Sequence, residues 1–311
     1  MTSETAAPRL PDQLGAVDQL LHRGEANPRT RSGIMALEVL DTVPDWERFR
    51  TNYEYASRRV PRLRQKVVTP TLPTAAPRWV VDPDFNLDFH VRRVRVPEPG
   101  TLREVFDLAE VALQSPLDIS RPLWSATLIE GLPDGQAAQL LHMSHAVADG
   151  LGFVEMFAQI YDLERDPAPG SVPPLPIPET LSPNELMRDG LNGIPGAVAG
   201  GVRSIVGGAV GAVGRAVAKP GSVVSGVVEY ATSSARMMRR AATPSPLLSM
   251  RSLSSRTEAI DIPLADLHRA AKAAGGSIND AYLAGLCGAL RRYHDALGVP
   301  IATLPMAVPV N

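Results

Sequence analysis

His145 and Asp149 are the residues of this sequence whose types and spacing point most directly to chemistry. His145 follows an apolar, strand-like run, and Asp149 comes four residues later, immediately before Gly150. An imidazole accepts and returns a proton near neutral pH, which few other side chains do. The spacing predicts a general base followed by a turn carboxylate, and it indicates acyl transfer to a hydroxyl or an amine. A histidine with a purely structural role at the end of a strand is the alternative.

His142 and His145 also raise the question of a metal site. Residues three apart on a strand point to opposite faces, so the two imidazoles are expected to diverge. The neighbouring sequence offers no cluster of cysteines or carboxylates that would complete a zinc shell. We therefore expect no metal here.

Apolar patterns predict a mixture of strands and helices around this segment. Strands are expected over residues 34–40, 67–68, 79–81, 85–96, 124–129, 137–143, 259–262 and 302–311. Helices are expected over residues 45–59, 102–113, 151–161 and 264–274, and a further helix is expected after Ser277, which can cap it. The mixture predicts an α/β fold in which His145 stands where a strand ends.

Length and composition limit the class of protein. The 311 residues, 44% of them hydrophobic, suffice for one large or two ordinary domains. A formal net charge of −2 provides no strong field to attract nucleic acid, so no nucleic-acid partner is expected. The single cysteine, Cys287, fits a reducing compartment, and its place within a helix predicts a core thiol. The N-terminal residues lack the pattern of a secretion signal, so a cytoplasmic location is expected.

Composition divides the chain into four regions. Residues 1–12 are expected to form a flexible N-terminal tail, and residues 13–165 a first domain that carries the histidine motif. Residues 166–245 begin as a Pro-rich linker and continue as Gly/Ala/Val-rich crossover helices. Residues 246–311 are expected to open a second, C-terminal domain.

The Gly/Ala/Val-rich part allows more than one interpretation. Arg203, Arg215 and Lys219 interrupt its apolar run, which disfavours a membrane span because a span needs about 20 apolar residues in succession. Packed or crossover helices are one interpretation, and contact of an apolar stripe with a membrane or lipid surface is the other.

Three motifs in chain order resemble those of the bacterial wax ester synthase/diacylglycerol acyltransferase family. They are Pro122-Leu123-Trp124, His145-x-x-x-Asp149-Gly150, and Asn279-Asp280 with the helix that follows. The resemblance implies the α/β fold of the coenzyme A-dependent, chloramphenicol acetyltransferase-like enzymes, with a mixed sheet flanked by helices. In that fold two similar domains meet around a tunnel. Residues 13–165 would then be the N-terminal acyltransferase domain, and residues 246–311 an incomplete second one.

The sequence departs from the family pattern in two places. The family usually has two adjacent histidines, and Ser144 stands at the first of them. This departure bears on fine tuning or acceptor choice more than on the base itself. Family members also continue into a substantial C-terminal half, so a second polypeptide or fragment carrying that half is an expected partner.

The resemblance implies roles for individual residues. His145 would be the general base, and no covalent acyl-enzyme would form. Asp149 would orient it by pairing with Arg62 or Arg64, or would be an ordinary turn carboxylate. Asn279 would stabilise an oxyanion, with a helix cap as the alternative. The substrate-binding residues implied are Ser144, Gly150, Pro122, Leu123, Trp124 and Asp280, of which Asp280 would also support the start of its helix.

The resemblance also implies the substrates. Acyl-CoA would be the co-substrate without any further cofactor, and diacylglycerol or a long-chain alcohol the acceptor, giving triacylglycerol or wax ester. Peripheral contact with the inner membrane or lipid droplets would follow from such substrates. Two alternatives stay open, which are acylation of another hydroxyl or amine, and a non-catalytic member of the fold that binds lipid or a partner protein.

Overall fold

The computed structural model of the chain describes residues 12–72, 75–147, 156–162, 164–165, 171–192, 245–249 and 252–304. The chain divides into two compact units, the first comprising Met1–Gly200 with Leu253–Thr257 and the second Gly201–Ser252 with Glu258–Asn311. The domain boundaries expected from composition, after residues 165 and 245, stay predictions.

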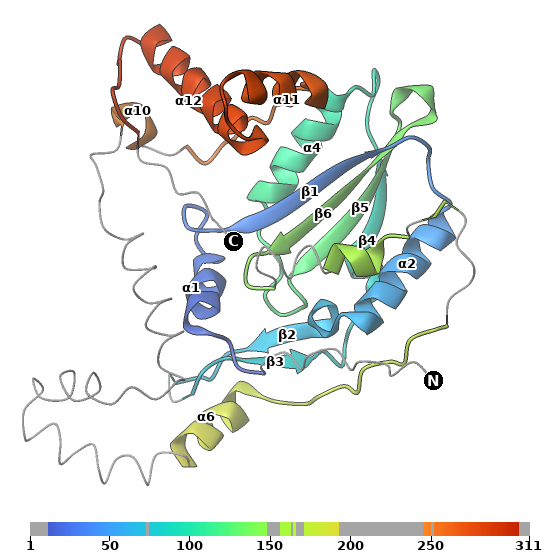
Figure 1. Cartoon of the computed structure of the whole chain (residues 1–311). Helices are drawn as coiled ribbons and strands as arrows, with labels where there is room; N and C mark the ends of the chain where they lie inside the picture. Colours follow the sequence, from blue (N-terminus) through green and yellow to red (C-terminus); the bar gives the residue numbers. More distant parts are fainter. Residues whose placement is uncertain are drawn as a thin grey trace, which may run out of the picture. The chain divides into compact units, whose positions relative to one another are not determined.

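A four-stranded mixed sheet forms the centre of the first unit (Figure 1). Its strands, in spatial order, are β1 (Gly33–Leu40), β6 (Ala137–Ser144), β5 (Trp124–Glu130) and β4 (Val91–Arg95). β6 runs antiparallel to both neighbours, whereas β4 and β5 run parallel. β2 (Gln65–Val68) and β3 (Arg78–Val81), which contain the strands expected over residues 67–68 and 79–81, pair separately as an antiparallel ribbon.

In the first unit helices surround these strands. In the second unit the described secondary structure is helical. Those of the first unit are α1 (Ala16–Gly24), α2 (Trp46–Arg59), α3 (Leu87–His90), α4 (Leu102–Gln114) and α6 (Pro183–Asn192), with 3-10 turns at Pro61–Arg64 and Pro133–Gly135. Those of the second unit are α10 (Pro246–Ser249), α11 (Leu264–Ala273) and α12 (Ile278–Ala296). Residues 156–160 are also helical.

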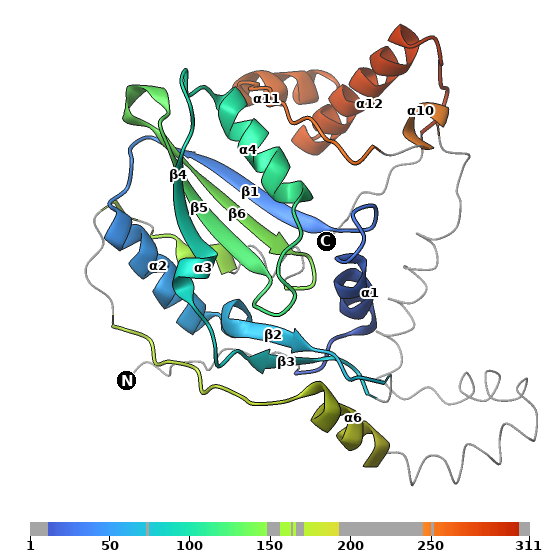
Figure 2. The same ribbon diagram turned by 180° about the vertical axis from the view of Figure 1, so that it is seen from behind.

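The sheet is covered on both faces, which explains why every residue of β6 is buried. Because side chains alternate along a strand, Leu141 and Met143 join the core that includes α2, while Ala138 and Leu140 join the core that includes α4 (Figures 1 and 2). A strand buried on both faces is a rigid support for the turn that follows it. The expectation of a mixed sheet flanked by helices is confirmed.

Two predicted strands are wrong. Residues 85–96 do not form one strand, because the Asn86 side chain accepts a hydrogen bond from the Asp88 N–H (2.9 Å) and starts the short helix α3. The strand begins only at Val91. Residues 259–262 pair with no strand in the described part of the chain, and Ile260 is 85% exposed.

The predictions for three other segments are tested only in part or not at all. Residues 302–304 form no strand, and residues 305–311 lie outside the described residues. Residues 151–155 of the helix expected after Gly150, and the Gly/Ala/Val-rich residues 193–232, also lie outside them. In the described ranges no helix combines the length and apolarity that crossing a bilayer requires.

Gly100 closes a turn in which an added methyl group has no room. Its φ is +72°, and an added Cβ would lie 2.0 Å from the carbonyl oxygen of Gly131. Gly100→Ala must therefore adopt an unfavourable left-handed backbone and displace a neighbouring peptide. We expect it to lower the free energy of unfolding by about 2 to 4 kcal/mol, measured by urea denaturation.

Gly135 provides the matched control for this substitution. Its φ is +71°, yet an added Cβ would have nothing within 4 Å. Gly135→Ala should therefore cost only the backbone penalty, about 1 kcal/mol. Equal losses in the two variants would show that the contact with Gly131 is unimportant.

Candidate active site

His145 lies in a turn that is anchored on both sides. β6 ends at Ser144, whose carbonyl accepts the Val147 N–H at 3.0 Å and whose hydroxyl accepts the Ala146 N–H at 3.3 Å. Ser144, Ala146 and Val147 are buried, whereas His145 between them is exposed. The turn thus holds its backbone against the core while leaving the imidazole accessible, as a general base requires.

The Pro-Leu-Trp motif lies beside this turn. The Leu123 carbonyl accepts the Ser144 N–H at 3.0 Å, and Trp124 pairs with Met143 across the two strands. Pro122 is buried, and Leu123 and Trp124 are each 1% exposed. The motif therefore supports the histidine turn from within the core. A direct contact of these three residues with substrate stays a prediction.

Trp124 is the centre of an aromatic stack. Its ring lies 4.7 Å from that of His90 and 5.9 Å from that of Tyr53, measured between centroids. Its indole N–H donates to the Leu63 carbonyl at 2.7 Å, and its own carbonyl accepts from His90 Nδ1 at 2.7 Å. The stack therefore connects α2, α3 and β5 within the core.

Two histidines of this region are buried, and both lie in surroundings that disfavour charge. Burial lowers the pKa of His90 to about 4, an effect that its hydrogen bond to Trp124 partly opposes. Burial, and secondarily the charge of Arg31, lowers the pKa of His142 to about 4. A Cβ added at Gly33 would lie 2.8 Å from His142 Nε2, so the imidazole packs closely against the Gly33 backbone. His142 is buried and His145 is exposed, so the two imidazoles lie in different environments.

These pKa shifts predict a pH-dependent stability. Because the folded-state pKa of each histidine lies below the ordinary value of 6.5, the unfolded chain binds more protons between these two values. The stabilisation is complete above pH 6.5 and is lost progressively as the pH falls towards 4. Between about pH 7 and about pH 5 the free energy of unfolding should fall by about 2 kcal/mol for each histidine.

Urea denaturation across this pH range checks the prediction. In His142→Gln the free energy of unfolding should fall less between about pH 7 and about pH 5, because one of these two buried histidines is gone. His268→Gln changes an exposed residue and should show the same fall as the wild type. An unchanged slope in His142→Gln would contradict the assignment.

Asn279 and Asp280 belong to the second unit, at the start of α12. Ser277 caps this helix, because its hydroxyl accepts the Asp280 N–H (3.2 Å) while Asp280 accepts the Ser277 N–H (2.7 Å). The bond from the Ser277 N–H, and secondarily a bond that the Ser277 hydroxyl donates to the Asp280 carboxylate (2.7 Å), lower the pKa of Asp280. The support of the helix start by Asp280 is therefore observed, and the cap is Ser277 rather than Asn279. Asn279 is exposed, and its oxyanion role stays a prediction.

Asp149 and Gly150 lie outside the described residues, so the arginine partner expected for Asp149 is not tested. Arg62 donates to Gln65 (2.7 Å) and its guanidinium lies 4.4 Å from the Trp79 ring, while burial lowers its pKa to about 10. Arg64 donates to the Glu54 carboxylate (2.6 Å) and to the Ser57 hydroxyl (3.0 Å).

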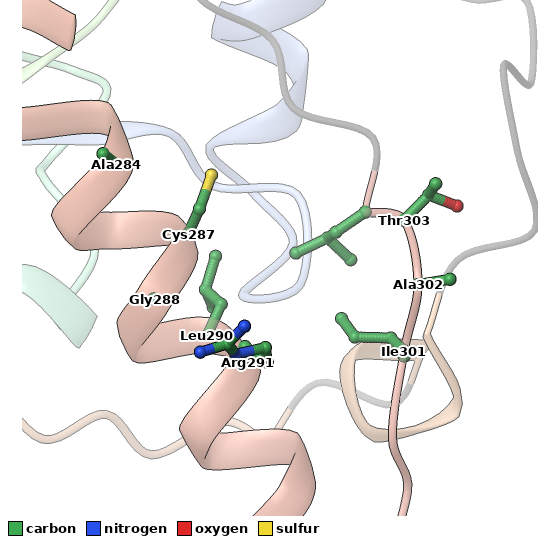
Figure 3. A pocket seen from close by; sticks show the side chains of 9 residues that line it. Ala284, Cys287, Gly288, Leu290, Arg291, Ile301, Ala302 and Thr303 are labelled. Atoms are coloured by element: carbon green, nitrogen blue, oxygen red, sulfur yellow. The ribbon is translucent and has the colours of Figure 1, made fainter. Parts of the chain in front are cut away.

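A hollow in the second unit lies between α12 and the segment that follows it. It is lined by Cys287, Leu290 and Arg291 of the helix, and Figure 3 shows the Ile301 side chain of the following segment pointing towards the helix. Cys287 is exposed, so the expectation of a core thiol is wrong. Tyr282 on the same helix is 60% exposed, so the described residues leave part of α12 uncovered.

The family of the chain follows from comparison with known sequences. The sequence profile of the wax ester synthase/diacylglycerol acyltransferase catalytic domain matches residues 5–282. The chain belongs to this family. Membership confirms the resemblance that the three motifs indicated.

The chain is also similar to individual proteins. A protein of Mycobacterium tuberculosis named a putative diacylglycerol O-acyltransferase is 75% identical over 311 residues, covering 100% of this chain and 63% of the relative. A second one from this organism is 34% identical over 313 residues, covering 95% and 63%. This chain thus spans less than two thirds of their length. The solved wax ester synthase/diacylglycerol acyltransferase of Marinobacter aquaeolei VT8 is 23% identical, with a TM-score of 0.40, covering 52% of this chain and 41% of that one.

What sequence inspection missed is the support around the histidine turn. Glu25, which accepts a hydrogen bond from Ser144, and the buried His90, whose pKa is lowered to about 4, carried no signal in the sequence that set them apart. Their importance comes from burial, which only the folded chain shows.

Proposed function

We propose that the protein is an acyl-CoA-dependent O-acyltransferase that transfers a long-chain acyl group to diacylglycerol or a long-chain alcohol. The observation that carries the proposal is the exposed imidazole of His145 in an anchored turn, in a chain that belongs to this acyltransferase family. The names of the Mycobacterium tuberculosis relatives support diacylglycerol as an acceptor.

The proposed mechanism uses His145 as a general base. The imidazole takes the proton of the acceptor hydroxyl while that oxygen attacks the carbonyl carbon of the thioester. As the tetrahedral intermediate collapses, the carbon–sulfur bond breaks, and the imidazolium returns the proton to the departing coenzyme A thiolate. The products are an ester and free coenzyme A, and no acyl group is attached to the protein.

The remaining roles follow from this scheme. Asp149 orients the imidazole, and the Asn279 amide, at the start of a helix, donates to the oxyanion. The exposed Asn279 side chain supports this role because Ser277 already provides the helix cap. Acyl-CoA acts as a co-substrate, and the scheme requires neither a cofactor nor a metal. Since both substrates carry long apolar chains, the reaction takes place in the cytoplasm at the surface of a membrane or a lipid droplet.

The test is an acceptor panel with the purified protein. Palmitoyl-CoA is mixed with diacylglycerol, a long-chain alcohol, a sugar or an amine, and thiol release and the acylated product are measured together. We expect thiol release and ester formation in equal amounts with diacylglycerol or the alcohol, and little of either without an acceptor.

Two outcomes would overturn the proposal. Preference for the sugar or the amine would reassign the acceptor class. Binding of palmitoyl-CoA without turnover of any acceptor would identify a lipid-binding protein instead of an enzyme.

A further inference from the structure

Glu25 is a buried carboxyl group that the proposed mechanism does not use. It follows α1, is 3% exposed, and its backbone N–H donates to the His22 carbonyl at 3.3 Å. Its Oε1 accepts a hydrogen bond from the Ser144 hydroxyl at 2.8 Å, across 119 residues of sequence. In the described part of the structure its Oε2 has no hydrogen-bond partner. Burying a carboxyl group without a hydrogen-bond partner costs folding free energy, and the bond from the Ser144 hydroxyl offsets part of this cost.

The Ser144 hydroxyl links Glu25 to the histidine turn. Its hydroxyl donates to Glu25 and accepts the N–H of Ala146, the residue after His145. A hydroxyl has one hydrogen, so donation to Glu25 directs its lone pairs towards Ala146. The Ser144 backbone meanwhile bonds Leu123 on one side and Val147 on the other. Every polar group of Ser144 is thus used to fix the backbone that carries His145.

We propose that Glu25 is a positioning residue for His145 and acts through the Ser144 hydroxyl. The inference rests on the proposed function, in which His145 must meet an acceptor hydroxyl at hydrogen-bond distance. Without the carboxyl group the Ser144 hydroxyl is free to rotate, its bond to Ala146 weakens, and the imidazole takes up a wider range of positions. The chemical step should suffer more than substrate binding, because Glu25 and Ser144 are buried and His145 is exposed.

The kinetic test compares four variants. Glu25→Ala and Ser144→Ala should each lower kcat by about 10- to 100-fold with little change in KM, because small errors in position are costly for catalysis. The double variant should be no slower than either single variant, since both remove the same contact. Glu25→Gln keeps a carbonyl oxygen that can accept from Ser144, and should retain kcat within about threefold of the wild type.

A matched control separates positioning from general loss of a buried hydrogen bond. Ser245 is 4% exposed and its hydroxyl bonds His294 Nε2 at 2.7 Å, away from the histidine turn in sequence and in the other unit. Ser245→Ala makes the same chemical change in another buried serine, and kcat should remain at the wild-type value. Urea denaturation of each variant confirms that the protein assayed is folded.

A second measurement does not depend on turnover. The chain has six histidines, so ring signals labelled with ¹³C are few, and His145→Gln assigns the signal of His145. Glu25→Ala and Ser144→Ala should shift this signal in the same way, while Glu25→Gln and Ser245→Ala should leave it in place.

The outcomes distinguish the two proposals. Wild-type kcat and an unmoved His145 signal in Glu25→Ala would overturn the positioning role while leaving the acyltransferase intact. A protein without turnover whose His145 signal still responds to Glu25 would overturn the proposed function and keep the contact. Additive losses in the double variant would show that Glu25 and Ser144 act separately, which contradicts the inference.

Discussion

Replacing His145 with alanine is expected to lower kcat/KM for acyl transfer by about 10²- to 10⁴-fold. The substitution removes the group that takes the proton from the acceptor hydroxyl, and the two described residues that follow it, Ala146 and Val147, are apolar and cannot replace it. Because His145 is exposed, the free energy of unfolding should stay within about 0.5 kcal/mol of the wild type. Thiol release with palmitoyl-CoA and urea denaturation measure the two effects.

His268 provides the control for this experiment. It is an exposed histidine on α11, and His268→Ala makes the same change without touching the turn. We expect wild-type turnover in this variant. Unchanged turnover in His145→Ala would refute the catalytic assignment, and a large loss of stability in that variant would show that the histidine has a structural role.

The second large effect is expected at Trp124, where an alanine should cost about 3 to 5 kcal/mol of folding free energy. The indole is 1% exposed and stacks with His90 and Tyr53. Its removal leaves a cavity in the middle of the core and an unpaired carbonyl on Leu63. The midpoint of urea denaturation, with an unchanged slope, measures the loss.

Two further substitutions separate the causes of this effect. Trp124→Phe keeps an aromatic ring and loses the indole N–H, so it should cost about 1 to 3 kcal/mol. Trp46→Ala removes a half-buried indole at the start of α2 and should cost less than Trp124→Ala. If Trp124→Ala kept its stability and lost only acyl-CoA binding, the residue would be part of a substrate channel instead of the core.

Sequence patterns predicted the elements whose signals are local. β1, β5 and β6 begin and end within one residue of the expected ranges, because strong runs of apolar residues end at turn residues. The start of α12 was also predicted, since Ser277 and Asp280 form their cap within four residues of chain.

The failures share a physical reason. Residues 87–90 have the alternation of a strand, yet a hydrogen bond that the Asn86 side chain accepts from the Asp88 N–H, and the stacking of the buried His90 on Trp124, favour a helical turn. Residues 259–262 have suitable composition for a strand, but a strand needs a hydrogen-bonded neighbour, and composition cannot supply one.

The sequence by itself determined the family of this protein and the residue proposed to act as its base, because the three motifs are short and contiguous. The tertiary structure decided what supports that base. Glu25 and Ser144 meet across 119 residues, and Trp124 meets Leu63 across 61, so neither contact leaves a periodic signal in the chain. Because buried polar groups need hydrogen-bond partners, such pairs fix the positions of segments that are far apart in the sequence.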